Sequence, residues 1–266
     1  MCAKRAECCF IAERKANDNR ENQTAMPTRV VGRISAIYRY PVKSMALEAV
    51  ESIDVSWNGL AGDRRWAFVR DSLVRSGFPW MTIRQRADMW RYTPRFVEPD
   101  KPEVSPTMVR TPTGDELDVV DPALAAELGE GVRVIRQTRG IFDTMPISLI
   151  STRTVDAIAH LSGTSMDARR FRPNFLVDPI DDVDFVEDGW VGSVLQIGAM
   201  KMRVDKRDKR CVVVNVDPDT TERNPSVLAS ITQERQACLG VYGSTVEPGI
   251  VSIGDLVCLC NTSSPV

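Results

Sequence analysis

Histidine is nearly absent from the sequence, which contains only His160. Catalysis by Ser-His-Asp or Cys-His groups needs a histidine base, and most protein zinc sites include histidine ligands. A lone histidine within a predicted helix is more commonly an exposed or packed side chain. Neither a Walker loop nor a GxGxxG fingerprint is present, and residues 163–167 lack the second glycine of a nucleophile elbow. These absences argue against the common hydrolase, histidine-metal and nucleotide-binding chemistries.

An excess of charge of one sign is also missing. Lys and Arg total 34 against 36 Asp and Glu, a formal net charge of −2, whereas non-specific nucleic-acid binders carry a clear basic excess. No apolar run approaches the ~18 residues of a membrane-spanning helix. Residues 1–26 lack the apolar core of a signal peptide. We therefore expect a cytoplasmic protein with neither nucleic acid nor a membrane as partner.

The seven cysteines include no Cys-x-x-Cys pair, and a cytoplasmic setting favours reduced thiols. Cys2, Cys8 and Cys9 lie near the N-terminus. Cys258 and Cys260 alternate along an expected strand. A disordered tail and a packed strand face explain these five positions better than metal binding does.

The length favours two packed domains, or one large one, over a single small module. The 266 residues suffice for two domains that each bury a core. Residues 1–28 are polar and charged without periodic apolar positions, so we predict a disordered tail, in which Met26 is an alternative to Met1 as the start. Short strands punctuated by Gly and Pro, with few helices, predict an α+β architecture that is rich in β-barrel.

Local signals place strands and helices along the chain. A turn at Asn58-Gly59 separates a strand pair expected at 49–55 and 65–70. Small polar residues before an apolar periodic run mark helix starts, and glycine marks a helix end. Further strands are expected at 33–38, 80–84, 106–111, 116–120, 132–136, 174–177, 194–197, 200–205 and 211–216, helices after Pro122, from Ser151 or Thr152 to Gly163 and near 226–235, and a strand-turn-strand over 249–257.

Cationic residues recur beside proline, glycine and aromatic residues. Scattered cations usually form a solvated face, but these neighbours fix local geometry. If the segments converge in the fold, they form a cationic cleft for an anion, because the guanidinium fork matches phosphate oxygens. The segments are Pro41-Val42-Lys43-Ser44, Gly62-Asp63-Arg64-Arg65-Trp66, Arg84-Gln85-Arg86, Arg169-Arg170-Phe171-Arg172-Pro173-Asn174 and Lys209-Arg210-Cys211.

Cys211 is the thiol with the most reactive surroundings. It follows the basic run 206–210, and neighbouring cations stabilise a thiolate, as a nucleophile or soft-metal ligand requires. The same residue could be a small hydrophobic side chain at the start of a strand over 212–214. Local chemistry leaves both interpretations open.

At these segments the chain resembles the MOSC family. The stretches 40–44 and 59–66 resemble the N-terminal β-barrel domain that precedes MOSC domains. The stretches 171–174 and 210–220 resemble the MOSC domain itself, and 249–257 is similar to its last barrel strands. The resemblance implies a division of the chain into a tail over 1–28, a MOSC N-terminal β-barrel domain over 29–138 and a MOSC domain over 139–262.

The resemblance implies a molybdenum–pterin cofactor (Moco) with Cys211 as the metal ligand. A soft thiolate suits this metal, because the pterin supplies the other sulfur ligands. Asp217 is implied as a catalytic proton relay, although an Asp-Pro turn explains it equally well. Pyridoxal phosphate is associated with some relatives, but no residue pattern here supports it. The implied cofactor-binding residues are Lys43, Ser44, Arg64, Arg84, Ser151, Thr152, Arg172, Asn174 and Arg210.

The mitochondrial amidoxime-reducing component and its bacterial relatives reduce N-hydroxylated compounds. By resemblance, the chain is expected to reduce N-hydroxylated or N-oxide small molecules with electrons from a ferredoxin or a cytochrome b5-like protein with its reductase. The sequence contains neither a four-cysteine cluster spacing nor room for the desulfurase domain of Moco sulfurases. The alternatives are a cofactor-handling or sulfur-carrier protein with a persulfide on Cys211, and a module that holds the cofactor without turnover.

Overall fold

A computed structural model of the protein describes residues 28–260 and is dominated by strands. The tail predicted over 1–28 lies outside the described residues except for Thr28, which begins the first strand. About 38% of the described residues lie in strands and 22% in helices, which confirms the predicted β-barrel-rich fold. No helix among residues 28–260 is long and apolar enough to cross a membrane.

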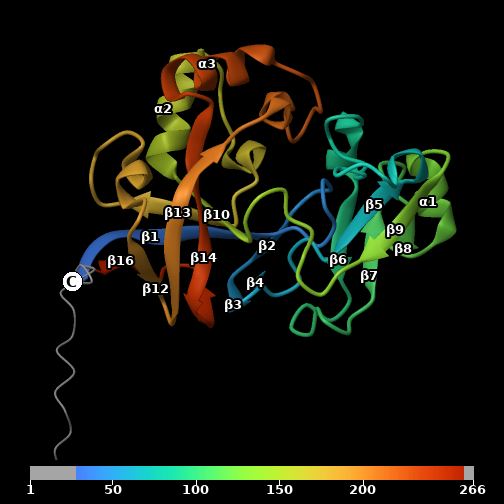
Figure 1. Cartoon of the computed structure of the whole chain (residues 1–266), viewed down its shortest axis with the longest axis horizontal. Coiled ribbons are helices and arrows are strands. Elements are labelled where there is room, and N and C mark those ends of the chain that lie inside the picture. Colours follow the sequence, from blue (N-terminus) through green and yellow to red (C-terminus); the bar gives the residue numbers. More distant parts are fainter. Residues whose placement is uncertain (1–27, 261–266) are drawn as a thin grey trace, which may run out of the picture.

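The largest unit is a closed barrel of seven strands, with both antiparallel and parallel pairings, seen at the left of Figure 1. The ring closes because β1 pairs with β16 along one edge and with β11 along the other. Gly32 lies where β1 crosses β11, and a Cβ there would stand 2.7 Å from a methyl group of Val177. The barrel strands, in ring order, are β1 (Thr28–Arg39), β11 (Phe175–Pro179), β10 (Ile147–Ser151), β14 (Cys238–Glu247), β13 (Met200–Lys209), β12 (Val194–Ile197) and β16 (Leu256–Cys260).

The N-terminal half forms smaller sheets beside the barrel, at the right of Figure 1. The elements are β2 (Glu48–Val50), β3 (Ser52–Ser56), β4 (Gly59–Leu60), β5 (Trp66–Arg70), η1 (Asp71–Leu73), η2 (Ala87–Arg91), β6 (Thr93–Phe96), β7 (Thr107–Arg110), β8 (Glu116–Asp118), α1 (Pro122–Leu128) and β9 (Val132–Arg136). The sheets β5-β9 and β6-β7-β8 share a core with Phe68, Met89 and Trp90 that is separate from that of the barrel. By contrast, β2 pairs with β1, and the apolar residues of β3 and β4 pack in the barrel core.

Two helices cover one end of the barrel. Ser151 caps α2 by accepting from the Thr154 N–H, and Gly163 ends it in the left-handed conformation, as the sequence predicted. Apolar residues of α2 and α3, including Ile158 and Ile231, form a third core with Phe171. The elements of this half are α2 (Thr152–Ser162), η3 (Ala168–Phe171), η4 (Val186–Trp190), η5 (Val212–Asn215), α3 (Pro225–Arg235) and β15 (Gly249–Ser252).

Three predictions about strands are wrong. The expected strand pair 49–55 and 65–70 does not form: β3 pairs with β4 and β15, whereas β5 pairs with β9. Residues 80–84 form no strand, only a single bridge at Trp80. Residues 211–216 form no strand, because most of them belong to the 3-10 helix η5. The Arg210 N–H bonds to Ala237 O, and the N–H groups of Val214 and Val216 then bond to the carbonyl oxygens three residues before them.

Candidate active site

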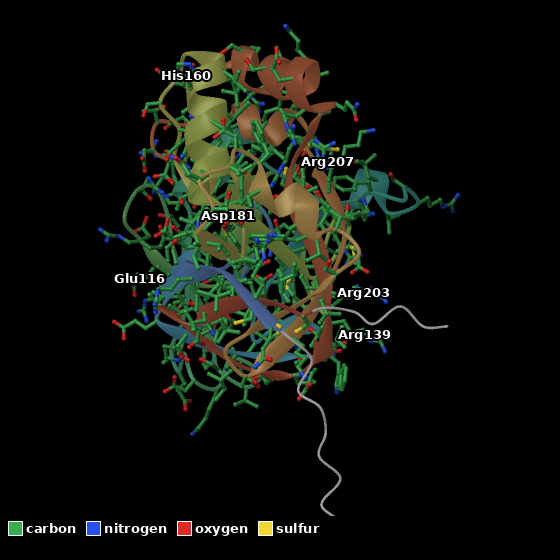
Figure 2. All side chains as sticks on the ribbon, turned by 90° about the vertical axis from the view of Figure 1, so that its left-hand side faces the viewer. Glu116, Arg139, His160, Asp181, Arg203 and Arg207 are labelled. Carbon is green, nitrogen blue, oxygen red and sulfur yellow. The ribbon has the colours of Figure 1, made fainter. Side chains whose placement is uncertain are left out.

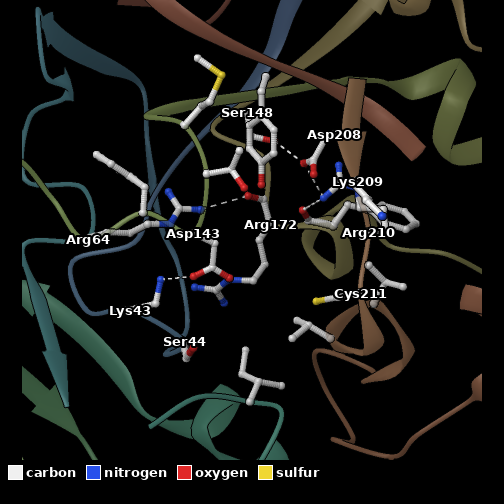
Figure 3. A pocket seen from close by; sticks show the side chains of 18 of the residues that line it. Lys43, Ser44, Arg64, Asp143, Ser148, Arg172, Asp208, Lys209, Arg210 and Cys211 are labelled. Carbon is white, nitrogen blue, oxygen red and sulfur yellow. Dashed lines mark hydrogen bonds and ion pairs between the residues drawn. The ribbon is translucent and has the colours of Figure 1, made fainter. Parts of the chain in front are cut away.

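The candidate site is a cavity between the N-terminal sheets and the barrel, which we call the cationic cavity. Figure 3 shows Lys43 and Arg64 on one side of it and Cys211 with Arg210 on the other. The sequence segments expected to converge therefore do meet. The cationic cavity is lined by Lys43, Ser44, Arg64, Ile83, Arg84, Phe142, Asp143, Thr144, Met145, Ser148, Arg170, Phe171, Arg172, Asn174, Asp208, Lys209, Arg210, Cys211, Val213, Val214 and Tyr242.

Lys43 and Ser44 lie in the turn that follows β1. The Lys43 Nζ donates to Ile141 O at 2.9 Å and pairs with the Asp143 carboxylate. Burial lowers the pKa of Lys43, and the charge of Asp143 opposes that effect. Ser44 has a φ of 68°, a left-handed conformation that is uncommon outside glycine. This turn thus presents a buried, paired cation to the cavity.

Arg64 and Arg172 both lie against the Tyr40 ring, with their Cζ atoms 4.6 and 4.2 Å from its centroid. Both have positive φ, 49° and 52°, so two side chains sit on backbone conformations that cost energy and that the surrounding fold must hold. Arg64 pairs with the Asp63 carboxylate and donates to Arg172 O at 3.3 Å. Arg172 donates from Nη1 to Met45 O at 2.9 Å, while its Nη2 is buried without a partner among the described residues.

Cys211 lies at the start of η5, partly buried, where its backbone leaves β13. The Arg84 Nη2 lies 3.2 Å from the Cys211 Sγ and 3.1 Å from the Asp143 carboxylate. The same Arg84 guanidinium stacks on Phe78 at 4.8 Å. Arg84 therefore places a fixed positive charge beside the sulfur, and both belong to the same cavity.

Arg210 and Asp208 form a buried pair in the cavity wall. The Arg210 Nη1 lies 2.9 Å from the Asp208 carboxylate and donates to Phe171 O at 2.7 Å. The Arg210 Nη2 is buried and has no partner among residues 28–260. Burial raises the pKa of Asp208 to about 6, and the charge of Arg210 opposes the rise. Ser148 contributes a hydroxyl 3.3 Å from the same carboxylate.

Asn174 has a scaffolding role within the wall. Its side-chain oxygen accepts from the Ser148 N–H at 3.1 Å, and its amide donates to Tyr38 O and to Asp63 at 3.2 Å each. These contacts tie β1, β10 and the Asp63 turn together. Asn174 lines the cavity, but its hydrogen-bonding groups are already engaged with protein.

The structure does not bring Ser151, Thr152 and Asp217 to the cavity lining. Ser151 is fully buried and donates to the Glu187 carboxylate at 2.8 Å. The Thr152 hydroxyl lies 3.3 Å from Asp178. Asp217 accepts from the backbone N–H groups of residues 219 and 220, as expected for a turn, and pairs with Arg170 at 2.7 Å. Each therefore has a structural contact in place of a direct contact with the cavity.

Two lining carboxylates, Asp143 and Asp208, were not predicted from the sequence. Asp143 pairs with Lys43, which lies 100 residues away in the chain, so no local pattern marks it. Asp208 pairs with Arg210, only two residues away, and stands within a run of cationic residues that drew attention to the cations alone. Ser148 replaces the predicted Ser151 as the lining serine of this segment. His160 is exposed near the end of α2, as Figure 2 shows, away from the cavity lining.

The charges of the cavity fit a phosphate group next to a thiolate. Seven cationic residues line it, and four carboxylates (Asp63, Asp143, Asp208 and Asp217) pair with them, which leaves three positive charges. A phosphate monoester carries about −1.5 to −2 and a thiolate −1. Two buried guanidinium nitrogens without partners supply donors for such a group. Within residues 28–260, no three His, Cys, Asp or Glu side chains cluster to hold a bare metal ion.

These features define a two-domain protein with a cavity lined by cationic residues and a thiol at its wall. The chain belongs to the MOSC family: a model of the MOSC N-terminal beta barrel domain matches residues 31–136, and a model of the MOSC domain matches residues 136–258. The expected family is thereby confirmed. The family is linked to the molybdenum cofactor.

One curated relative and several solved structures are similar to the chain. Molybdenum cofactor sulfurase from Drosophila mojavensis is 23% identical over 261 residues, and the match covers 80% of this chain and 32% of the relative. The chain thus spans about a third of that relative's length. The YuaD protein from Bacillus subtilis aligns with a TM-score of 0.49 and 13% identity over 88% of this chain and 97% of that chain. YiiM from Geobacillus stearothermophilus aligns with a TM-score of 0.36 and 15% identity over 45% and 56%.

Proposed function

We propose that this protein is a molybdenum-cofactor-binding oxidoreductase that reduces N-hydroxylated or N-oxide small molecules. The observation that carries the proposal is the charge balance of the cationic cavity: three uncompensated positive charges surround a thiol. Reduction of an N–OH group to N–H consumes two electrons and two protons and releases water. When bound, the cofactor supplies a metal centre that accepts oxygen and changes its oxidation state by two electrons.

The chain's own residues would hold the cofactor at both ends. Lys43, Arg64 and Arg172 lie together on one wall, where charge-assisted hydrogen bonds would bind the phosphate. Cys211, on the opposite wall, would ligate the metal as a thiolate. Arg84 would hold its positive charge beside the sulfur through its 3.2 Å contact.

The electrons would come from a separate protein, a ferredoxin or a cytochrome b5-like protein with its reductase. This part rests on the family resemblance and on the lack of flavin, nicotinamide or iron–sulfur motifs in the sequence. The remaining walls of the cavity, with Ile83, Phe142 and Val213, are apolar and would contact the substrate. Asp217 is then a positioning residue, because its contact with the cavity passes through Arg170.

A second candidate is a sulfur-carrier protein with a persulfide on Cys211. The similarity to molybdenum cofactor sulfurase supports it, and so does the partial exposure of a thiol beside an arginine. In this case a donor protein's persulfide would pass its outer sulfur atom to the Cys211 thiolate, which leaves the donor as a thiol. Cys211 would then pass the same sulfur atom to an acceptor, and no electron donor for N–O reduction would be needed.

Metal, pterin and mass analysis of the purified protein separates these functions. The oxidoreductase should contain molybdenum and pterin in equal amounts and should reduce an N-hydroxylated test compound when given a chemical reductant. A sulfur carrier should instead show a 32 Da addition at Cys211, the mass of one sulfur atom. Protein with neither the cofactor nor the added sulfur, after production in a host that makes Moco, would contradict both candidates.

A further inference from the structure

Arg172 differs from the other arginines of the cationic cavity in how its charge is stabilised. Arg64, Arg84 and Arg210 each pair with a carboxylate. Within the part of the chain that the structure describes, Arg172 has no ion pair, and its only side-chain hydrogen bond goes to Met45 O. A buried guanidinium without a counter-charge is costly, so another interaction must hold it.

Two aromatic rings lie against the Arg172 guanidinium. Its Cζ atom lies 4.2 Å from the centroid of Tyr40 and 4.6 Å from that of Trp90. The Tyr40 ring lies in turn 4.6 Å from the Cζ of Arg64. These contacts join Arg64, Tyr40, Arg172 and Trp90 in that order, and we call the row the cation–aromatic stack.

The rings of the stack are themselves fixed. Tyr40 is fully buried and its hydroxyl donates to Pro173 O at 3.1 Å. Trp90 belongs to η2 and to the core of the N-terminal sheets. Its indole N–H has no hydrogen-bond partner among residues 28–260, so Trp90 contacts Arg172 through its ring and not through a hydrogen bond.

An aromatic face stabilises a cation without neutralising it, because the attraction comes from the ring quadrupole. A carboxylate at the same place would compete with any bound anion. Both rings lie close to the guanidinium, and Met45 O accepts a hydrogen bond from its Nη1. The Nη2 is the other terminal nitrogen, and it has no hydrogen-bond partner among the described residues.

We infer that Tyr40 and Trp90 are positioning residues that keep the Arg172 charge available for the phosphate of the bound ligand. Trp90 acts without lining the cavity, so the N-terminal sheets contribute to anion binding through the stack. The inference rests on the proposed function for the identity of the ligand, but the stack itself should act on any phosphate.

The test compares Trp90→Met, which removes the ring face, with Trp90→Phe, which keeps one. The control is Trp190→Met, because Trp190 is equally buried but lies in the barrel core. Two readouts are used: the rate at which pterin is lost on dialysis, and the rise in Tm that inorganic phosphate causes in cofactor-free protein, which reports affinity. Trp90→Met should weaken phosphate binding and speed pterin loss about tenfold, whereas Trp90→Phe and Trp190→Met should stay within about threefold of the parent.

Equal phosphate affinity in the parent and in Trp90→Met would overturn the inference. If that variant does not fold, Tyr40→Met removes the other ring, and the same criterion applies to it. The proposed function fails separately: a parent that never holds pterin, yet binds phosphate more tightly than Trp90→Met, would refute the cofactor and keep the stack.

Discussion

The buried Asp208 carboxylate makes the stability of this protein depend on pH in a way that a single substitution can isolate. Asp208 is 1% exposed, and burial raises its pKa to about 6 from the model-compound value of 3.8. The folded state therefore holds the Asp208 proton more tightly than the unfolded chain. The resulting stabilisation is complete below about pH 4 and is lost as the pH rises through about 6.

The magnitude follows from the shift. Two pKa units at 1.36 kcal/mol each correspond to roughly 3 kcal/mol of unfolding free energy lost between pH 4 and pH 7. Asp208→Asn cannot titrate, although its amide oxygen can still accept from Arg210. The free energy of unfolding of the variant minus that of the parent should thus become more positive by about this amount as the pH rises from 4 to 7.

Urea unfolding of both proteins at pH steps from 4 to 7 measures this difference. Other carboxyl groups, such as Asp143 and Asp167, have lowered pKa values and titrate with the opposite effect on stability. They are present in both proteins and cancel in the difference. A difference that stays flat with pH would refute the reasoning, because it would mean that Asp208 titrates alike in the folded and unfolded chains.

Three further predictions concern the cofactor. Arg172→Lys keeps the charge but loses the planar fork and its packing against the two rings, so cofactor occupancy should fall severalfold in metal analysis while urea unfolding still shows a folded protein; full occupancy would contradict this. Ser151→Ala removes a helix cap and should cost about 1–2 kcal/mol of unfolding free energy, yet leave the molybdenum content unchanged; a loss of metal in folded protein would place Ser151 in the site. Turnover should require an added reductase or chemical reductant, and activity with NADH alone would disprove the need for a separate donor.

Elements with local signals were predictable from the sequence, and long-range pairings were not. The bounds of α2 could be predicted, because the cap at Ser151 and the end at Gly163 each depend on residues within one helical turn. The partner of β5 is β9, more than sixty residues away, and nothing in the local pattern near Trp66 specifies it. The apolar run after Cys211 suggested a strand, but its valines pack as a 3-10 turn between two cores.

The residues of the candidate site also fall into those that the sequence predicted and those that it did not. Lys43, Arg64 and Arg172 were found because each stands in a recognisable segment, and the structure brings all three to one cavity. Their counter-charges and stacking partners were missed, because residues such as Asp143 and Trp90 gain their roles only from contacts across the fold. Charge balance is a property of the assembled cavity, and single-sequence patterns cannot report it.

The role of Cys211 is the central claim, and molybdenum content of Cys211→Ser tests it most directly. Serine replaces a soft thiolate with a hard, mostly protonated hydroxyl that binds molybdenum poorly. The fold should survive with a stability loss of about 1 kcal/mol. Cys258→Ser is the matched control, because Cys258 is a partly buried thiol of β16 outside the cavity.

Metal analysis and an N-hydroxylated test substrate should be applied to the parent and both variants. The account predicts that Cys211→Ser loses molybdenum and falls to background activity, that part of the pterin stays because Lys43, Arg64 and Arg172 still bind its phosphate, and that Cys258→Ser matches the parent. Molybdenum content and activity in Cys211→Ser equal to those of Cys258→Ser would contradict it.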